Sequence, residues 1–307
     1  MAEPWHADIT LSPATAKRLI ADQFPDVPAH TAELAAEGWD NWLYRAGSWI
    51  FRFPRRQVVV PAVEIEMAVL PGLAPMLPLP IPDAARRGTP DPQFPYPFFG
   101  YREIPGRATG QAAPTPKMRR QSAVPLAEFL HVLHNISPRD AARLGAGPPL
   151  FNRLDLDVTV PRFGEWMDKA AARGLLPVRG APLLAEAERL RAAAGLFFPP
   201  LGLAHGDLNF KNVLLDDSGA LSGVVDWCDV HIGHPAVDLA LAWGLLPSAS
   251  RQVFLEAYGP VDSLTWRVAR FMSWYVNLIV LVSAADSHNA ADVREAQWEI
   301  LNAADDT

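Results

Sequence analysis

The sequence predicts an α+β protein with two lobes, a small strand-rich lobe followed by a larger helical lobe. The chain has 307 residues, and at roughly 150 residues per domain this length suits two domains or one large bilobal unit. Strand patterns prevail up to about residue 105, and helical periodicity prevails from about residue 107. We therefore place the lobes at residues 1–105 and 106–307, with a connector from Tyr101 to Gly106.

The first lobe begins with a helix and continues as a strand pair. Ser12 is the predicted N-cap and Pro13 the first helical residue, because both residue types favour these positions. The apolar residues that share one face of this helix are Ala16, Leu19 and Ile20. The segment WLYRAGSWIFRFP is rich in aromatic and β-branched residues, so it predicts two strands joined by a turn at Gly47.

A second helix, a proline-rich connection and a third strand complete this lobe. The helix is expected to start at Pro61 and to end at Pro71, because proline lacks the N–H that a helix interior requires. Its predicted apolar face is formed by Ile65, Ala68 and Val69. Nine prolines lie between Pro71 and Pro97, so this segment predicts loops and edge strands. PFFGYREI predicts the next strand.

Three helical patterns and one non-helical insert define the second lobe. APLLAEAERLRAAAG predicts a helix with Gly195 as its C-cap, and Ser263 to Ala285 predicts a long apolar helix. Between them, VLLD and SGVVD predict two short strands joined by a turn at Asp217 to Gly219. LAEFLHVLHNI carries apolar residues at i, i+3, i+4 and i+7, namely Leu126, Phe129, Leu130 and Leu133.

Composition and charge exclude several classes of protein. Lys and Arg number 27 against 34 Asp and Glu, so a net charge of -7 gives no overall attraction to nucleic acid or anionic lipid. With Cys228 as the single cysteine, neither an intrachain disulfide nor a thiolate zinc cluster can form. The first residues lack a signal-peptide pattern, and the most apolar stretch, Leu278 to Ala285, is far shorter than the roughly 20 residues of a membrane span. We expect a soluble cytoplasmic protein without nucleic acid, membrane or an obligate protein partner.

The strongest chemical signal is a group of polar residues on the insert. His205, Asp207 and Asn212 form the pattern HxDxxxxN. Asp226 follows 19 residues after Asp207, at the end of the second short strand. Phosphoryl transfer requires a carboxylate that orients and deprotonates the attacking hydroxyl, and an oxygen ligand and a second carboxylate that hold Mg²⁺ on the phosphates. Turns also use Asp, Asn and Gly, but the spacing and the flanking strands favour phosphoryl transfer.

The same residues carry a family resemblance. HGDLNFKNVLLD followed by GVVDWCDVHIGHPAVDLA resembles the signature of the aminoglycoside phosphotransferase family, which includes macrolide phosphotransferases and has a bilobal protein-kinase-like fold. The resemblance implies that Asp207 is the catalytic base and that His205 supports the catalytic loop. It implies that Asn212 and Asp226 bind Mg²⁺. It further implies that Asp238, in HPAVDLA, accepts hydrogen bonds from the backbone of this loop.

The resemblance also implies that the first lobe binds the nucleotide, ATP or GTP, and that the second lobe is catalytic and binds the acceptor. EGWDN is similar to the phosphate-covering loop of aminoglycoside kinases that act at the 2'' hydroxyl, which assigns Gly38 and Asn41 to the phosphates. FFGYREIPG looks like the hinge on which backbone groups hydrogen-bond the base, which places the base near Tyr101 to Ile104.

One position departs from the kinase pattern. Arg52 stands on the strand where kinases usually carry the phosphate-binding lysine. Arginine keeps the charge and can bind phosphate oxygens through two N–H groups, with Arg55 and Arg56 as the next candidates. Glu66 aligns with the helix acid that pairs with this cation, and Glu64 is the neighbouring alternative.

Acceptor specificity is expected from the helical lobe. A polycationic aminoglycoside requires carboxylates, whereas a macrolide requires an apolar trough. Trp266, Arg270 and Trp274 recur at i, i+4 and i+8, so we expect them on a lobe or pocket surface. The acids available are Asp229, Glu256, Asp262, Asp286, Asp292, Glu295 and Glu299.

The sequence therefore predicts a phosphotransferase that moves the γ-phosphate of ATP or GTP to a hydroxyl of a small molecule. An aminoglycoside-type antibiotic is the first candidate acceptor, which would make the protein a resistance enzyme, and a macrolide or a metabolite such as an amino alcohol or a sugar is the alternative. A nucleotide-binding pseudoenzyme is a second possibility, because the strand lysine is missing. A third is a metallohydrolase that binds a transition metal through His205, Asp207, Asp226, His231 and His234.

Overall fold

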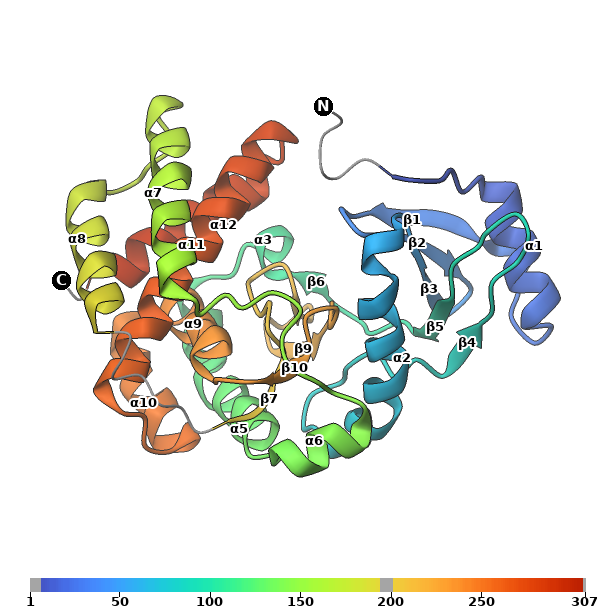
Figure 1. Ribbon diagram of the computed structural model, residues 1–307, viewed down its shortest axis with the longest axis horizontal. Helices are drawn as coiled ribbons and strands as arrows, with labels where there is room; N and C mark the ends of the chain where they lie inside the picture. Colours follow the sequence, from blue (N-terminus) through green and yellow to red (C-terminus); the bar gives the residue numbers. More distant parts are fainter. Residues whose placement is uncertain (1–6, 194–200, 306–307) are drawn as a thin grey trace. The chain divides into compact units, whose positions relative to one another are not determined.

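The structure, a computed structural model, describes residues 7–193 and 201–305. This part of the chain forms two compact units. The antiparallel sheet belongs to the first unit and most helices belong to the second (Figure 1), which confirms the predicted α+β class. The first unit comprises the described residues up to Met76, Pro80–Ile104 and Arg143–Ala146, and the second comprises Leu77–Leu79, Pro105–Ala142 and the described residues from Gly147 onward.

A five-stranded antiparallel sheet forms the centre of the first unit. Gly47, with a φ of 61° in the left-handed region that glycine adopts readily, joins β2 to β3 as predicted. β4 is an edge strand in the proline-rich segment, which confirms the expectation there. The strand order is β1 (Glu33–Glu37), β2 (Asn41–Ala46), β3 (Trp49–Pro54), β5 (Phe98–Arg102) and β4 (Arg86–Gly88).

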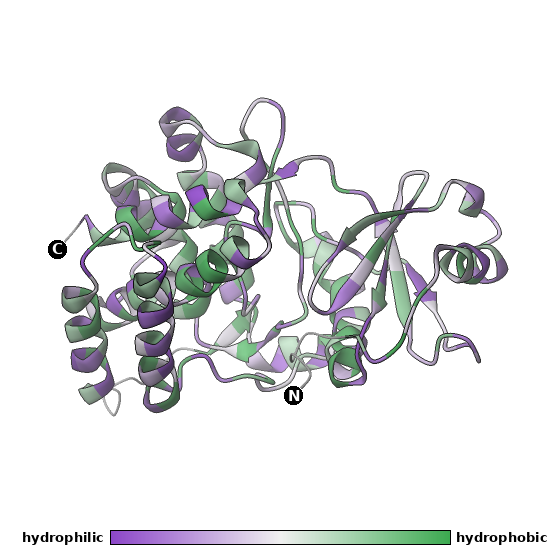
Figure 2. Ribbon diagram, turned by 90° about the horizontal axis from the view of Figure 1, so that it is seen from above, coloured by the Kyte–Doolittle hydropathy of each residue, from purple (hydrophilic) through white to green (hydrophobic). Residues whose placement is uncertain are grey.

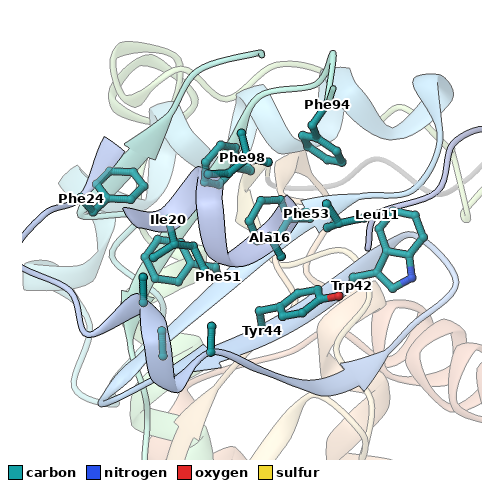
Figure 3. Packing of buried hydrophobic residues seen from close by; sticks show 14 of the residues in the cluster. Leu11, Ala16, Ile20, Phe24, Trp42, Tyr44, Phe51, Phe53, Phe94 and Phe98 are labelled. Carbon is teal, nitrogen blue, oxygen red and sulfur yellow. The ribbon is translucent and has the colours of Figure 1, made fainter. Parts of the chain in front are cut away.

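Helix α1 (Pro13–Gln23) begins and packs as predicted. The Ser12 side chain accepts a hydrogen bond from the Thr15 N–H, which caps the helix. Its predicted apolar face is buried and packs with phenylalanines of the sheet (Figure 3). The rings of Phe53 and Phe98 are stacked with centroids 4.4 Å apart, and both side chains are fully buried. Each such burial contributes roughly 1.5–3 kcal/mol to stability.

Helix α2 (Val60–Leu73) continues past Pro71, so the predicted end was wrong. Proline deprives the carbonyl four residues earlier, that of Met67, of its helical partner. The Arg87 guanidinium donates to this carbonyl from outside the helix, which offsets the loss. The predicted apolar face was also wrong, because Glu66 is buried whereas Ala68 is exposed.

Ten helices follow β5 in the described chain. Figure 2 shows green apolar and purple polar residues on the same helices, which is typical of helices that bury one face. They are α3 (Thr109–Ala112), α4 (Pro116–Gln121), α5 (Ala123–His134), α6 (Pro138–Leu144), α7 (Leu156–Ala172), α8 (Gly180–Ala192), α9 (Ala236–Leu245), α10 (Ser248–Tyr258), α11 (Ser263–Asp286) and α12 (Ala290–Ala304).

The three helical patterns of the sequence correspond to α5, α8 and α11. The four apolar residues predicted for one face of α5 are all fully buried. Helix α8 ends at Ala192 with Ala193 as its cap, earlier than predicted, and Gly195 lies outside the described residues. Helix α11 spans the predicted segment and extends it by one residue, to Asp286.

Two helical stretches pass a test of length and apolar composition for a membrane span, namely Gln57–Met76 and Ser263–Asp286. The expectation that the most apolar stretch, Leu278 to Ala285, is far shorter than a membrane span was therefore wrong, because this stretch is part of the 24-residue helix α11. Helices in protein cores pass the same test, and 67% of the most apolar window of α11 is buried against other parts of the structure.

Short strands position the loop that carries the HxDxxxxN motif. β8 (Val213–Leu215) and β9 (Leu221–Val224) form the predicted hairpin, and β6 (Arg107–Ala108) pairs with β8. β7 (Gly202–Ala204) pairs with β10 (His231–Gly233). The motif lies between β7 and β8, so both of its ends are fixed by strand pairing.

Candidate active site

The hairpin brings Asp226 beside the HxDxxxxN loop, as predicted. Asp226 follows β9 after one residue. The N–H of the preceding Val225 donates to the backbone oxygen of Asn212 at 2.9 Å. The Val225 oxygen lies 3.0 Å from His205 Nε2. Both ends of the motif are therefore hydrogen-bonded to the residue that precedes Asp226.

His205 is fully buried and makes contacts that support the loop. Burial lowers the pKa of His205, so the imidazole is neutral at neutral pH. Its Nδ1 accepts from the Asp207 N–H at 3.3 Å, and Nε2 therefore carries the proton and donates to Val225. The ring lies 4.6 Å from the buried indole of Trp227, centroid to centroid.

Asparagine side chains fix the backbone at Asp207. Asn212 Nδ2 donates to the backbone oxygen of Asp207 at 2.8 Å, and Asn209 Nδ2 donates to the same oxygen at 3.0 Å. The Asn212 amide also lies 3.5 Å from Asp207 Oδ2. Because Asn212 uses its nitrogen in these contacts, its oxygen Oδ1 is the atom that suits a metal ion.

The backbone of Asp226 is unusual. Its φ of 65° lies in the left-handed region, which few residues other than glycine adopt, although aspartate is among the more tolerant. Backbones of this kind are found frequently at functional sites. The half-buried Asp226 carboxylate and the Asn212 amide oxygen are the hard oxygen donors that Mg²⁺ prefers.

Asp238, in the first turn of α9, accepts hydrogen bonds from the loop backbone, which confirms the predicted contact. The N–H of His205 donates to Oδ2 at 2.7 Å, and the N–H of Gly206 donates to Oδ1 at 2.9 Å. Burial alone would raise the pKa of Asp238, but hydrogen bonds from His134 and Gly206 hold this pKa below its ordinary value. The loop is thus attached to α9 through a buried carboxylate.

His134 extends this network, which the sequence did not reveal. From the sequence we expect His131 and His134 to be helix-face residues beside a leucine stripe and not metal ligands. His134 Nε2 lies 3.1 Å from Asp238 Oδ2, and its Nδ1 lies 2.9 Å from the Tyr258 hydroxyl. Burial raises the pKa of Tyr258, so the hydroxyl keeps its proton and donates it to Nδ1.

Arg153 is the second residue that sequence analysis missed. Its Nη2 lies 3.1 Å from Asp207 Oδ1, and the same nitrogen forms an ion pair with Asp229. Burial raises the pKa of Asp207 above its ordinary value, and the Arg153 guanidinium opposes this rise. No local signal marked Arg153, because FNRLDLD has the composition of an ordinary polar connection.

The histidines of the metallohydrolase alternative are engaged within the protein. His231 Nδ1 lies 2.7 Å from the backbone oxygen of Asp229, and His234 Nδ1 accepts from the Ala236 N–H at 2.9 Å. Burial lowers the pKa of His234 to about 4. Across residues 7–193 and 201–305, no three His, Cys, Asp or Glu side chains form a group that could hold a metal ion. An Mg²⁺ site differs, because substrate phosphates supply part of its coordination.

The predicted pair of Arg52 and Glu66 is present in the first unit. Arg52 Nη1 lies 3.4 Å from Glu66 Oε1, and the two side chains are 5% and 0% exposed. Glu64, the alternative partner, is exposed. The guanidinium also lies 5.8 Å from the centroid of the Phe99 ring.

The segment predicted to cover the phosphates is a tight turn between β1 and β2. The Gly38 N–H donates to the Asn41 oxygen at 2.9 Å. A Cβ at Gly38 would meet only ordinary van der Waals contact, so the turn does not require glycine there. Arg55 donates to the Gly38 oxygen and Arg56 forms an ion pair with Asp40. The two alternative phosphate-binding cations therefore contact the turn itself.

Tyr101 and Ile104, the predicted hinge, lie at the end of β5. Tyr101 is buried and opposite Ile50 of β3. On its other side β5 pairs with β4 only as far as Gly100. The Glu103 N–H donates to the backbone oxygen of Ser48 at 2.9 Å, which keeps this end of the strand against the β2–β3 turn. Half-buried Ile104 is the last residue of this segment of the first unit.

The face with Trp266, Arg270 and Trp274 was predicted on a lobe or pocket surface, and Trp266 and Arg270 are half-buried there. Trp274 is fully buried. Arg270 Nε donates to the Ala303 oxygen at 2.8 Å, and its guanidinium lies 4.8 Å from the Trp274 ring centroid. Arg270 therefore caps the C-terminal carbonyls of α12.

Solved structures share this fold. A GDP complex of wild-type aminoglycoside 2'-phosphotransferase-IIIa is 21% identical, with a TM-score of 0.70 over 97% of this chain and 100% of that chain. Macrolide 2'-phosphotransferase MphH from Brachybacterium faecium is 23% identical, with a TM-score of 0.59 over 92% of this chain and 95% of that chain. These likenesses confirm the predicted kinase-like fold.

Sequence relatives match shorter stretches. Homoserine kinase from Neisseria meningitidis serogroup B is 34% identical over 122 residues, which is 36% of this chain and 39% of that enzyme. The uncharacterized protein YcbJ of Bacillus subtilis is 30% identical over 64 residues, which is 21% of each chain. Residues 31–272 match the model of the phosphotransferase enzyme family. Because this match spans most of the chain, the protein belongs to the phosphotransferase enzyme family and is, as predicted, a phosphotransferase.

Proposed function

We propose that the enzyme moves the γ-phosphoryl group of ATP or GTP to a hydroxyl of a small-molecule acceptor. The observation that carries this proposal is the fixed arrangement of Asp207, Asn212 and Asp226 in the second unit. Hydrogen bonds from the loop to Asp238 and to Val225 hold that arrangement in place. A kinase needs these groups in fixed positions, because positioning and electrostatics supply most of the catalysis of phosphoryl transfer.

Asp207 is the residue that would act on the acceptor. Its carboxylate would accept the proton of the attacking hydroxyl and orient this hydroxyl in line with the γ-phosphorus. In a loose transition state the proton leaves late, so orientation is the larger part of this contribution. His205 and Asn209 would act indirectly, through the backbone and position of Asp207.

Asn212 Oδ1 and the Asp226 carboxylate would hold Mg²⁺. When bound, the ion neutralises negative charge on the triphosphate. The donor set fits the ion, because both atoms are hard oxygens and Mg²⁺ commonly takes only one or two protein carboxylates. The left-handed backbone of Asp226 gives independent support for a functional role.

The first unit would bind the nucleotide. Arg52, oriented by Glu66, would contact phosphate oxygens, and Gly38 and Asn41 lie on the turn that would cover them. The base would hydrogen-bond to backbone groups from Tyr101 to Ile104. Relatives include a GDP complex of aminoglycoside 2'-phosphotransferase-IIIa and a streptomycin and ATP complex of APH(2'')-IIa. Backbone recognition is compatible with either purine, so we propose ATP or GTP as donor.

The acceptor classes follow from the relatives. Aminoglycoside and macrolide phosphotransferases share the fold, and a homoserine kinase matches part of the sequence. We therefore propose an aminoglycoside, a macrolide or a small hydroxylated metabolite as acceptor. A panel that represents these classes contains kanamycin, erythromycin, homoserine and 3-aminopropan-1-ol.

The test is acceptor-dependent nucleotide consumption. The enzyme is incubated with Mg²⁺ and ATP or GTP, with and without each acceptor, and mass spectrometry identifies the phosphorylated product. The proposal predicts nucleoside diphosphate and phosphorylated acceptor in equal amounts. The pseudoenzyme alternative predicts nucleotide binding without transfer to any member of the panel. That result would contradict the proposed activity.

A further inference from the structure

Helices α5 and α10 lie side by side in the second unit (Figure 1), and two histidines of α5 contact Tyr258. Tyr258 is the last residue of α10, because Gly259 leaves the helix with a φ of 107°, a value that glycine adopts readily. His131 Nδ1 lies 2.8 Å from the backbone oxygen of Tyr258, and His134 Nδ1 lies 2.9 Å from the Tyr258 hydroxyl. The Tyr258 ring is stacked on that of Phe254, with centroids 5.7 Å apart. These contacts fix the position of the hydroxyl relative to the His134 imidazole.

The positions of the protons follow from the neighbours of His134. Asp238 is ionised at neutral pH, since its pKa lies below its ordinary value, and a carboxylate can only accept hydrogen bonds. His134 Nε2, 3.1 Å from Asp238 Oδ2, therefore carries a proton. The carboxylate leaves the other ring nitrogen undecided, because Nδ1 holds a lone pair in neutral imidazole and a second proton in imidazolium. Burial raises the pKa of Tyr258, so its hydroxyl keeps its proton, donates to Nδ1 and favours the neutral form.

His205 and His234 are buried titratable side chains that interact with this network in the second unit. Both are neutral at neutral pH, because burial lowers the pKa of His205 and lowers that of His234 to about 4. The protonation of His134 therefore depends mainly on two neighbours. The charge of Asp238 attracts a second proton to the ring, whereas the Tyr258 hydroxyl occupies the nitrogen that would take it.

The form of the His134 ring matters because Asp238 Oδ2 accepts from two donors. These are His134 Nε2 at 3.1 Å and the His205 N–H at 2.7 Å. If the single ring proton lay on Nδ1, the lone pair of Nε2 would face the carboxylate and repel it. If both nitrogens were protonated, the imidazolium would attract the carboxylate and compete with the backbone N–H for Oδ2. Either change would shift the carboxylate that holds the loop just before Asp207.

We propose that Tyr258 is a positioning residue of the catalytic loop, whose hydroxyl keeps His134 neutral with the proton on Nε2, so that Asp238 holds the loop backbone in one position. The connection runs from Tyr258 through His134 and Asp238 to the N–H groups of the loop. Its effect on turnover rests on the proposed function. The position of the protons on His134 does not depend on that function.

Long-range proton–nitrogen NMR of histidine side chains reports the tautomer and charge of His134 directly. The full chain is labelled with isotopic nitrogen in its histidines, and the signals that disappear in His134→Gln are those of His134. In the wild-type protein at neutral pH we expect the neutral form with the proton on Nε2. In Tyr258→Phe, which removes only the hydroxyl, we expect a second proton on the ring or the opposite tautomer. Thermal unfolding verifies that each variant is folded.

Steady-state kinetics with the acceptor that the panel identifies tests the connection to turnover. Tyr258→Phe should lower kcat by about 3-fold to 10-fold, the effect of a single lost hydrogen bond, with the KM values for nucleotide and acceptor unchanged. A glutamine side chain donates through its amide nitrogen and has no second tautomer. In a His134→Gln background, Tyr258→Phe should therefore have little further effect on kcat, whereas a role in packing alone would lower kcat equally in both backgrounds.

Tyr96→Phe is the matched control. Tyr96 is a buried tyrosine of the first unit, its ring lies 5.7 Å from that of Phe94, centroid to centroid, and burial raises its pKa as it raises that of Tyr258. The change removes a buried tyrosine hydroxyl outside the network of His134. The His134 signals and kcat should both stay at their wild-type values in this variant.

Three results would overturn the inference and leave the proposed function intact. One is a doubly protonated His134 in the wild-type protein at neutral pH. Another is an unchanged set of His134 signals in Tyr258→Phe. The third is a kcat that Tyr258→Phe leaves unchanged, or lowers equally in both backgrounds. Absence of transfer to every acceptor of the panel would instead contradict the proposed function, and the NMR comparison would still decide the position of the protons on His134.

Discussion

The loop with Asp207 and the turn with Gly38 are held by different kinds of contact. The loop is attached to α9 through the buried carboxylate of Asp238, which accepts two backbone N–H groups. The turn is closed by a backbone hydrogen bond from Gly38 to Asn41, by a second from the Arg55 N–H to the Asp40 oxygen, and by the guanidinium groups of Arg55 and Arg56. Buried hydrogen bonds define atomic positions more narrowly than partly exposed contacts of guanidinium groups. We infer that the second unit carries preformed chemistry, whereas the first carries an adaptable phosphate contact.

The largest effect on activity is expected at the end of the hairpin. Asp226→Ala should lower kcat by about 10³ or more, because the proposed metal ligand is lost and charge stabilisation of the triphosphate is lost with it. The free energy of unfolding should fall by no more than about 1–2 kcal/mol, the cost of the left-handed backbone at alanine, since a half-buried loop carboxylate adds little packing. Steady-state kinetics at saturating Mg²⁺ and urea unfolding measure the two quantities. Activity near the wild-type level would remove Asp226 from the metal site.

The attachment of the loop to α9 is tested by Asp238→Ala. The change leaves the N–H groups of His205 and Gly206 buried without an acceptor, and each such group costs about 1–3 kcal/mol. Urea unfolding should therefore show a loss of about 2–6 kcal/mol, accompanied by a loss of activity. Asp217→Ala is the control, because the Asp217 side chain is 99% exposed, and it should stay within about 0.5 kcal/mol of wild type. Equal stability of the two variants would contradict the buried-network account.

The proposed phosphate contact of the first unit is tested by Arg52→Ala. It should raise the KM for nucleotide by about 10-fold to 100-fold with a smaller change in the acceptor KM, and Arg52→Lys should recover part of the loss. Arg52→Ala also leaves Glu66 buried without its cation, which destabilises the unit. The double variant Arg52→Ala with Glu66→Gln separates these two effects. Unchanged nucleotide kinetics in that double variant would assign the phosphate contact to another residue.

The last effect concerns the pH dependence of stability and the buried carboxylate of Glu299, whose pKa is raised whereas that of Asp238 is lowered. Burial and the charge of Glu295 raise the pKa of Glu299 to about 8, so between about pH 4.5 and 8 the folded state holds a proton that the unfolded state has released. Stability should therefore fall as pH rises through this window, by up to about 1.4 kcal/mol per pH unit. Urea unfolding as a function of pH measures this slope. Glu299→Gln should flatten it, and a slope that persists in this variant would assign it to another group.

Local patterns in the sequence predicted the parts of the site that depend on neighbouring residues. The motif from His205 to Asn212 and the hairpin that follows it were predicted from residue types at short spacing, whereas the contact of Asp238 with the loop backbone was implied by the family resemblance. The roles of Asp207, Asn212 and Asp226 stay predictions. Arg153 was not predictable, because it lies 54 residues before Asp207 in the chain and only the tertiary fold brings them together.

Contacts between residues that are distant in sequence also explain what the sequence did not predict about His134 and what it predicted wrongly about Pro71. His134 has the spacing of a helix-face residue, and its buried contact with Asp238 comes from a helix 104 residues away in sequence. Pro71 carries a strong local signal for a helix end, but a side chain from a later strand satisfies the carbonyl that the proline leaves free. In this protein local residue preferences predicted where helix α1 starts. A contact from a later strand allows helix α2 to continue past Pro71.

The most direct test of the proposed mechanism is Asp207→Asn, which keeps the shape of the side chain and removes its basicity. A positioned general base contributes about 10²–10⁴ in rate, so steady-state phosphorylation should show a kcat lower by a factor in that range. Nucleotide affinity, measured by calorimetry with Mg²⁺, should stay at the wild-type value, because Asn212 and Asp226 are unchanged. Turnover at the wild-type rate would contradict the assignment of Asp207 as the catalytic base.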